Sequence, residues 1–404
     1  MKRDVYLLKI KNNIGKNYVF LGLSYVDLTR GLWMIWLTLR GFSLTQLGVM
    51  EGLFHLTTFL MEVPTGIVAD LFGRKMSRIL GRIIFFGSLF ILYYSRSFPV
   101  QCLGFSLSAI GYNLESGAGE ALIYDSLKEI GRESVYKKIA GINNLIFEGG
   151  SIISLIVGGY CAHNLGYQWV FIPGMTVSAM SIVVAVLFEE PTIIQEEQHR
   201  LREMGWFQAM KEQTLMSVQV IVEKPRIAFI ILFTELVMMF IASLYFYLQT
   251  FWKSEGRNEL QIGGYLALAS VLSAAAGILT GKIEKKIGVR GIILFFPFLL
   301  ILSIWGIGLT DYSVFFYGIT GFVDGVLFVA MQDYLNKLIP SERRATILSF
   351  QSMAFSLYMI LFFPLIGLIG EQRGLQTAFL ILAVVATLMY AVYLIISMRK
   401  RNGN

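Results

Sequence analysis

Apolar runs of about 20 residues, separated by short polar connections, are the dominant pattern of this chain. A helix rises about 1.5 Å per residue, so each run is long enough to cross a hydrocarbon layer of about 30 Å. The runs lack the strict apolar–polar alternation of membrane-barrel strands. The pattern predicts an all-α integral membrane protein with twelve transmembrane helices. The spans are expected at residues 18–39, 44–69, 78–96, 99–127, 139–162, 166–188, 226–251, 259–281, 291–310, 312–339, 345–370 and 374–398.

The longest connection, from Glu189 to Pro225, separates the first six spans from the last six. Its start is acidic, whereas apolar residues between Trp206 and Ile221 recur at helical spacing. This later part is expected either as a helix along the membrane face or as a plain linker. The predicted organisation is an N-terminal six-helix bundle at residues 1–188, a connector at 189–225 and a C-terminal six-helix bundle at 226–404.

The two sets of six spans carry traces of a repeat. Similar turns follow the second and the eighth span, each with two glycines seven residues apart and a charged residue between them. These are Gly66, Asp70 and Gly73 in the first turn, and Gly281, Lys285 and Gly288 in the second. Repeated six-span units predict two pseudo-symmetric bundles with a substrate site near the midplane between them.

Basic residues gather in alternate connections, which sets the orientation. They precede the first span, follow spans two, four, eight and ten, and end the chain. By the positive-inside rule, both termini and the long connector are expected in the cytoplasm. The sequence is 55% apolar and 15% charged, with a mean hydropathy of +0.64. Its formal charge of +7 is explained by these basic loops and the lipid surface they face, rather than by nucleic-acid binding.

Cysteine and histidine give no sign of a metal centre. The two cysteines, Cys102 and Cys161, are expected to pack between helices as small apolar side chains, with a disulfide as the open alternative. Three scattered histidines show no metal-ligand spacing. No nucleophile or diphosphate-processing motif is present either. The chain is therefore expected not to be an enzyme and to need no metal or cofactor.

The first turn carries the most specific signal. From Gly66 to Lys75 it reads G-I-V-A-D-L-F-G-R-K, and its degenerate copy ends at Gly288. This resembles the loop signature of the major facilitator superfamily, and the resemblance covers essentially the whole chain. The strings E-V-P-T-G and A-L-I-Y-D-S-L-K-E resemble bacterial members grouped with multidrug exporters. The resemblance implies a multi-pass transporter of a bacterial cytoplasmic membrane.

The resemblance also implies a cytoplasmic gate at this turn. Asp125 is the implied partner of Arg74 in a charged latch, whereas the glycines permit the tight turn. The gate residues are expected to be Gly66, Asp70, Gly73, Arg74, Lys75 and Asp125. Because Lys285 replaces the aspartate in the second copy, the latch is predicted only in the N-terminal half.

Two motifs depart from the pattern of drug:proton antiporters. Such exporters usually carry an arginine four residues before a glycine of the fourth helix; with Gly117 as that glycine, this chain has Asn113. In the fifth-helix pattern G-x-x-x-G-P-x-x-G-G, Ser154 and Leu155 replace the middle glycine and the proline. Nutrient uptake and lipid flipping therefore stay open beside antiport.

Ionisable side chains within the spans mark candidate sites for substrate or protons. Each costs about 2.5 to 3.5 kcal/mol at the centre of a membrane helix, so its retention favours a role. The cavity candidates are Asp27, Arg30, Glu51, His55, Asn113, Glu115, Glu148, Glu235 and Asp324. Glu115 is the leading candidate to face the cavity. Glu148, Glu235 and Asp324 are isolated, and each is expected either to exchange a proton or to hydrogen-bond a neighbouring helix.

Helical spacing groups some of these candidates. Asp27 and Arg30 would share one face of the first span, either as an ion pair or as substrate or proton groups. In the second span Glu51 and His55 share one stripe with Glu62, which suits proton handling. The alternative for Glu62 is a structural ion pair with a cation of the third span, such as Arg82.

These features converge on one leading hypothesis. Acidic groups outnumber Arg30 and Arg82 at depth, and aromatic residues make up 14% of the sequence, so the cavity should favour cationic or neutral amphiphiles. We expect a monomeric, proton-coupled secondary transporter that exports a small molecule. A non-transporting sensor would need a larger soluble domain than the connector provides.

Overall fold

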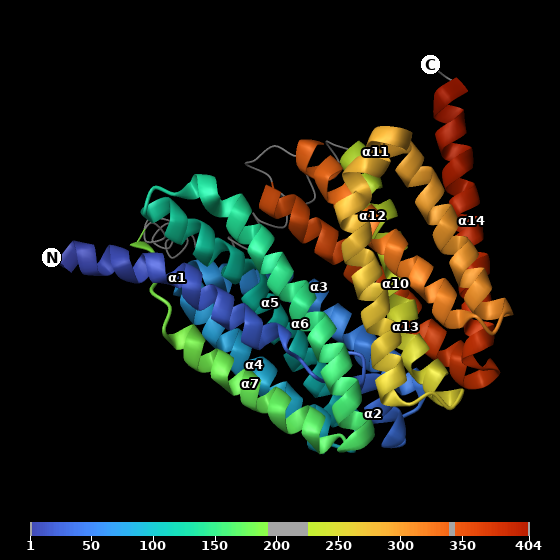
Figure 1. The fold of residues 1–404 in the computed structure, drawn as a ribbon, viewed down its shortest axis with the longest axis horizontal. Helices are drawn as coiled ribbons and strands as arrows, with labels where there is room; N and C mark the ends of the chain where they lie inside the picture. The colour runs from blue at the N-terminus through green and yellow to red at the C-terminus, as the bar shows by residue number, and fades with distance from the viewer. Residues whose placement is uncertain (1, 193–224, 339–343, 403–404) are drawn as a thin grey trace.

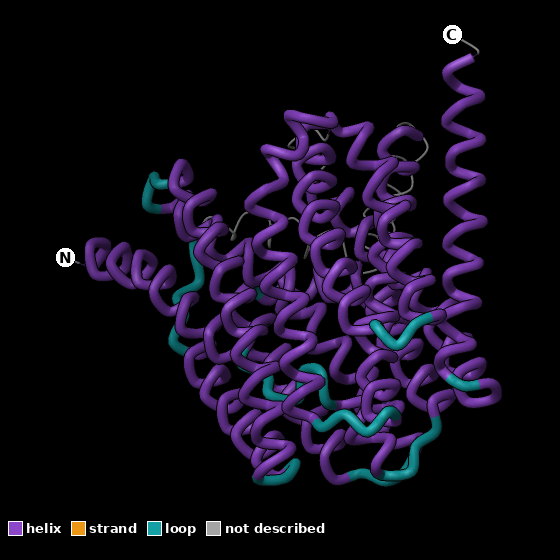
Figure 2. The backbone as a smooth tube through the Cα atoms, turned by 45° about the vertical axis from the view of Figure 1, so that its right-hand side comes forward, coloured by secondary structure: helices purple, strands orange, loops and turns teal. Residues whose placement is uncertain are grey.

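The structure, a computed structural model, describes residues 2–192, 225–338 and 344–402. Helices make up nearly all of this part of the chain, and it contains no strand (Figures 1 and 2). The predicted membrane-face helix between Trp206 and Ile221 lies outside the described residues. The α-helices are α1 (Lys2–Tyr25), α2 (Trp33–Leu39), α3 (Leu44–Phe72), α4 (Arg74–Tyr94), α5 (Phe98–Glu129), α6 (Tyr136–Asn164), α7 (Gln168–Val186), α10 (Pro225–Ser254), α11 (Glu259–Leu309), α12 (Ser313–Leu338), α13 (Arg344–Arg373) and α14 (Leu375–Asn402).

The prediction of twelve spans is confirmed, although the spans and the helices do not correspond one to one. The 51 residues of α11 contain a non-helical Gly288, where φ is 69° and ψ is 169°, and the chain reverses there between spans eight and nine. At the other end of the chain, α1 and α2 together make the first crossing. Among the described helices, nine are long and apolar enough to cross a membrane, and α11 is long enough to cross twice.

The first span is not the continuous helix over 18–39 that its apolar pattern predicts. Helix α1 ends at Tyr25 and α2 begins at Trp33. Between them Asp27 Oδ1 accepts hydrogen bonds from the backbone N–H of Thr29 at 3.0 Å and from its hydroxyl at 2.6 Å, and Gly31 has a φ of 75°. Such local side-chain bonds compete with helical hydrogen bonding. The shared helical face expected for Asp27 and Arg30 is therefore wrong.

Helices α1–α7 pack into one bundle and α10–α14 into the other, and three helix pairs make most of the contact between the halves. Helix α3 packs along α13, α6 packs along α11, and α2 contacts α10. Figure 1 shows that the halves meet near α2 and spread apart toward the C-terminus. We call the end with the 40–43 connection the α2 end, and the opposite end, with residues 66–75, the Gly73 end.

Glycines permit the close contact of the halves at the α2 end. A Cβ on Gly263 of α11 would lie 2.3 Å from the carbonyl oxygen of Leu155 on α6. A Cβ on Gly367 of α13 would lie 2.4 Å from that of Leu44 on α3. Only glycine fits where two helix backbones come this close, so these glycines allow the two halves to pack tightly at the α2 end. Cys161, in the same region, is a free thiol, as is Cys102.

The internal repeat is visible in the backbone. Gly73 and Gly288, which occupy equivalent positions after spans two and eight, both have positive φ values, 96° and 69°. Only glycine adopts this region without strain. The equivalent turns of the two halves therefore use the same glycine backbone conformation, although their side chains differ.

Candidate functional site

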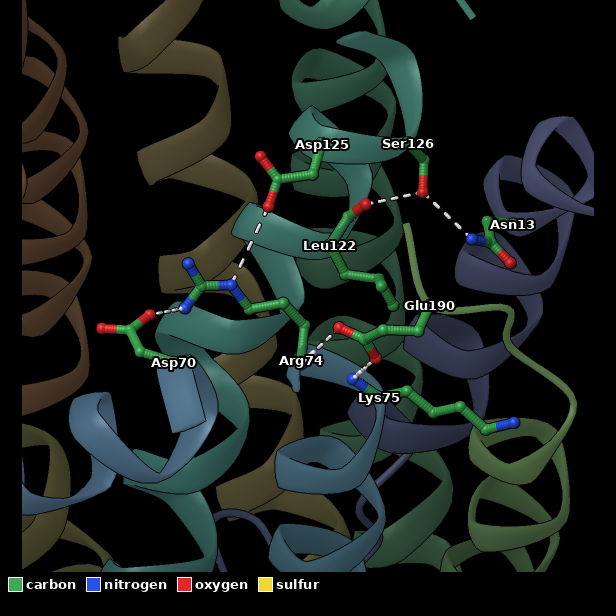
Figure 3. A network of polar contacts seen from close by, with 8 residues as sticks. All are labelled: Asn13, Asp70, Arg74, Lys75, Leu122, Asp125, Ser126 and Glu190. Carbon is green, nitrogen blue, oxygen red and sulfur yellow. Dashed lines mark hydrogen bonds and ion pairs between the residues drawn. The ribbon is translucent and has the colours of Figure 1, made fainter. Parts of the chain in front are cut away.

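The Gly73 turn, residues 66–75, joins α3 to α4 and is held by an acid that follows the sixth span. Glu190 Oε1 accepts the backbone N–H of Arg74 at 2.7 Å, and Oε2 accepts that of Lys75 at 2.8 Å (Figure 3). These N–H groups begin α4 and have no partner within the helix, so a carboxylate there is stabilised by hydrogen bonds and by the helix dipole. Burial raises the pKa of Glu190 above that of a free carboxyl.

The chain segment that carries Glu190 is fixed by the N-terminal part of α1. The Asn13 amide donates to the Ser126 hydroxyl at 3.0 Å and to the backbone carbonyl of Glu189 at 2.8 Å, and the N–H of Glu189 donates back at 3.0 Å (Figure 3 shows the bond to Ser126). Sequence reasoning placed Glu190 in the acidic start of the connector and missed its role at the turn. Its position directly after a span was the available signal.

Arg74 lies between two aspartates, as Figure 3 shows. It forms a hydrogen-bonded ion pair with Asp70 one turn earlier, and its Nε lies 3.8 Å from Asp125 Oδ2 on α5. The second pair is the one that the family resemblance implies. Together with Glu190, these contacts tie α3, α4, α5 and the end of α7 to one another, so the contacts of Arg74 with described residues all lie within the N-terminal half.

A substitution at Gly73 should test how tightly Glu190 holds this turn. In Gly73→Ala the new Cβ would lie 2.9 Å from the Glu190 carboxyl carbon and would also sit at a φ of 96°. We expect a loss of about 2 kcal/mol, from backbone strain and the lost carboxylate contact, measured as a lower Tm in detergent. The matched control is Gly288→Ala, which has a similar φ and no heavy atom within 4 Å of its Cβ. Equal losses of Tm in the two variants would contradict this account.

A cavity of about 720 Å³ lies between the two halves. Both halves line it, the N-terminal half through the 26–32 break, α2, α3, α4, α5 and α6, and the C-terminal half through α10, α11, α12 and α13. Six of the nine cavity candidates are in its wall: Asp27, Arg30, Glu51, His55, Glu148 and Asp324. The other three, Asn113, Glu115 and Glu235, lie elsewhere.

The acids in the cavity wall have different surroundings in the two halves. Arg30 donates to the Ser151 hydroxyl at 2.5 Å and stacks over Phe147 at 5.2 Å, so its charge lies against α6, the helix that also carries Glu148. In the C-terminal half, Asp324 accepts only the Ser273 hydroxyl, at 3.0 Å, among described residues. Asp27 and Arg30 do not form an ion pair in the described part of the chain, which excludes the structural pairing considered for them.

The expected stripe on α3 is partly present. His55 Nε2 lies 3.5 Å from Glu51 Oε1, and both residues face the cavity. Glu62, further along the helix, accepts the hydroxyl of Ser352 on α13 at 3.4 Å, which is a contact between the halves. Arg82 instead donates to two serine hydroxyls of α7. The alternative pairing of Glu62 with Arg82 is therefore wrong.

The remaining three candidates do not line the cavity, and each has a partner on another helix. Glu115 pairs with Arg78 at 3.1 Å, so the expectation that it leads the cavity wall is wrong. Asn113 donates to the backbone carbonyl of Thr58 at 2.9 Å, and Glu235 accepts from the Gln351 amide at 2.6 Å.

Arg78 is fully buried, which explains why Glu115 turns toward it. Its guanidinium lies 4.0 Å from the centre of the Phe20 ring and 4.7 Å from that of Phe188. It also donates to the Asn17 side chain at 3.0 Å. A buried cation needs an opposite charge and hydrogen bonds to offset its lost hydration, and the nearby carboxylate of Glu115 supplies the charge.

At the α2 end, a polar cluster around Glu259 bridges the halves; sequence reasoning did not foresee it. The Glu259 carboxylate accepts Lys253 Nζ at 2.7 Å from its own half and the Tyr167 hydroxyl at 3.2 Å from the N-terminal half. His163 of α6 lies 3.9 Å from its other oxygen. On the neighbouring interface Glu371 accepts the backbone N–H of Thr45 at 3.0 Å. We call Glu259, Lys253, Tyr167 and His163 the Glu259 cluster.

Large aromatic residues of the first and seventh spans take different positions in the structure. Trp33 and Tyr245 line the cavity, and the Trp33 ring contacts Phe105 at 5.1 Å and Phe246 at 5.6 Å. Trp252 is buried instead and donates to the Ser313 hydroxyl at 2.9 Å. The cavity therefore has an aromatic wall that spans both halves.

Comparisons with known proteins agree with this architecture. The model of the Major Facilitator Superfamily matches residues 19–319 and 310–404. The chain is 22% identical over 384 residues to the uncharacterized MFS-type transporter YxaM of Bacillus subtilis (strain 168), and the match covers 92% of both chains. Crystal structures of the nucleoside transporter NupG (TM-score 0.74, 16% identity, 96% of this chain and 98% of that chain) and of a D-xylose-proton symporter (TM-score 0.70, 12% identity, 96% of each chain) share its fold.

Proposed function

This chain belongs to the major facilitator superfamily, and we propose that it is a proton-coupled secondary transporter that exports a small cationic or neutral amphiphile by alternating access. The single observation that carries the proposal is the composition of the cavity wall. Carboxylates from both halves face one cavity, Glu148 from α6 and Asp324 from α12, beside an aromatic wall. Movement of one half against the other would change their exposure, which is what coupling to protons requires.

The proposed cycle uses the two ends of the molecule as gates. The Gly73 end, with its basic residues, faces the cytoplasm together with both termini. The cytoplasmic gate comprises Gly66, Asp70, Gly73, Arg74, Lys75 and Asp125, to which we add Glu190. The units that move are residues 1–188 and 226–404, joined by the connector at 189–225. The tight glycine contacts at the α2 end make this conformation one with its outer gate closed.

Proton-coupled uptake of a nutrient is a second candidate, and a specific feature favours it. The cavity wall contains many hydroxyl groups, including those of Thr58, Ser151, Ser273, Thr320 and Ser356. Hydroxyls suit polar, neutral substrates, whereas a general cation exporter needs few of them. The solved nucleoside transporter and xylose-proton symporter with this fold fit the same alternative.

Transport in proteoliposomes decides between these functions. We expect a pH gradient to drive tetraphenylphosphonium, as a cationic probe, or uridine, as a neutral one, across the membrane. Movement opposite to the proton flux supports export, whereas movement with it supports the uptake alternative. If neither probe responds to a pH gradient of either sign, proton-coupled transport of these substrate classes is refuted. Empty liposomes and protein reconstituted with a proton uncoupler serve as controls.

A further inference from the structure

Two buried polar atoms on the cavity face of α3 have no hydrogen-bond partner among described residues. They are Nδ1 of His55 and Oγ1 of Thr58. Both residues line the central cavity, yet they are only 7% and 4% exposed. Buried polar atoms in folded proteins are almost always satisfied, so a polar wall with unused groups is shaped for a polar partner.

The chemistry of the pair follows from its neighbours. His55 Nε2 faces the Glu51 carboxylate at 3.5 Å, so in its neutral form the ring has its proton on Nε2 and presents Nδ1 as an acceptor. Thr58 lies three residues along the same helix face, and its hydroxyl can donate. The wall therefore offers one acceptor beside one donor.

A hydrogen bond from the neighbouring helix α5 fixes the backbone at Thr58. Asn113 of α5 donates to its backbone carbonyl at 2.9 Å, which connects α3 to α5 at this turn. Asn113 does not line the cavity, although the sequence marked it as a candidate. It acts as a positioning residue for the pair.

Aromatic rings from both halves frame the pair. Phe54 contacts the His55 ring at 5.2 Å and Tyr112 at 6.4 Å. Phe355, on α13 of the other half, contacts the His55 ring at 5.4 Å. A flat ring suits such surroundings, because aromatic edges and faces pack well against planar ligands. The Glu51 carboxylate beside the pair faces His55, so among described residues its charge is directed to that ring.

We propose that His55 and Thr58 form a substrate subsite for a neutral planar ring that carries an N–H donor beside a carbonyl acceptor. The N–H donates to His55 Nδ1, and the carbonyl accepts the Thr58 hydroxyl. The assignment deepens the proposed transport function and rests on it, since the subsite lies in the transport cavity. It names the cyclic amides and imides as the substrate class.

Binding to the purified protein tests the subsite without any transport step. Uridine carries the required N–H between two carbonyls, and 3-methyluridine lacks that donor. By titration calorimetry we expect wild-type protein to bind uridine at least about tenfold more tightly than 3-methyluridine. In His55→Phe and Thr58→Val, which keep side-chain shape, uridine should bind about tenfold more weakly. The preference over 3-methyluridine should also disappear in His55→Phe.

Two controls separate the possible failures. Thr176→Val removes a hydroxyl outside the cavity, one on α7 that is bonded to the Ile172 carbonyl at 2.9 Å, and should leave uridine affinity unchanged. A monodisperse gel-filtration profile shows that each variant is folded. If His55→Phe does not fold, Thr58→Val tests the subsite alone. Absence of uridine binding by wild type, or unchanged affinity in both variants, overturns the subsite even where pH-driven transport of tetraphenylphosphonium succeeds. The expected binding pattern without transport of either probe would refute the proposed function and leave the subsite standing.

Discussion

Asp324→Asn should abolish pH-driven accumulation of substrate while leaving substrate binding and exchange intact. Asp324 faces the cavity from α12, and its partner among described residues is the neutral hydroxyl of Ser273. Asparagine keeps the size and the hydrogen bond but has no proton to exchange. A gradient of one pH unit supplies about 1.4 kcal/mol per proton, which is about tenfold accumulation for one coupled proton. The variant should therefore fall from about tenfold to no accumulation in proteoliposomes.

Two further variants make this prediction specific. Asp311→Asn removes an exposed acid on the connection that precedes α12 and should transport normally. Glu148→Gln should also lower accumulation, because this carboxylate lines the same cavity from the other half. Full pH-driven accumulation by Asp324→Asn would show that this carboxylate does not carry the coupled proton.

Glu259→Gln should shift the protein toward a conformation in which the α2 end is open. The Glu259 carboxylate receives the Tyr167 hydroxyl of the other half and lies near His163, so it holds the halves together in this state. Hydrogen bonds to a charged group are roughly twice as strong as neutral ones, so the change should cost the closed state about 1 to 2 kcal/mol. This is a shift of about five- to thirtyfold in the equilibrium between the two conformations.

Distances between spin labels at Leu165 and Arg257 would measure this shift. These exposed residues lie at the α2 end on opposite halves, and the labels require prior replacement of Cys102 and Cys161. We expect a longer-distance population to grow in Glu259→Gln. Glu255→Gln, which neutralises an exposed acid in the same connection, should not change the distribution. An unchanged distribution in Glu259→Gln would remove the Glu259 cluster from the outer gate.

Much of the site could be inferred from the sequence where the signal is local. The spacing of Glu51 and His55 placed both side chains on one helix face, and both line the cavity. The same reasoning failed at Asp27 and Arg30, because an Asp–Leu–Thr turn followed by Gly31 interrupts the helix on which the argument depended. That interruption also had a local signal, in residues that favour turns over helix.

The direction in which a single acidic side chain points could not be inferred in the same way. Glu115 and Glu148 look alike in the sequence, since each is a carboxylate within an apolar span. The structure directs Glu115 to the buried Arg78 and Glu148 into the cavity wall. Depth in the membrane can be counted along one helix, but the partner depends on which other helices pack beside it.

The membrane class, the twelve spans, the repeat and the turn at Gly73 follow from the amino-acid sequence, because hydrophobic run length and glycine conformation are properties of short segments. The packing of the helices is needed to know which ionisable groups share the cavity and which are paired elsewhere. It also brought Glu190 to a turn 116 residues earlier in the chain and Tyr167 to Glu259, 92 residues later. Such contacts form where helices distant in sequence meet, and their energies depend on burial and geometry that no local pattern contains.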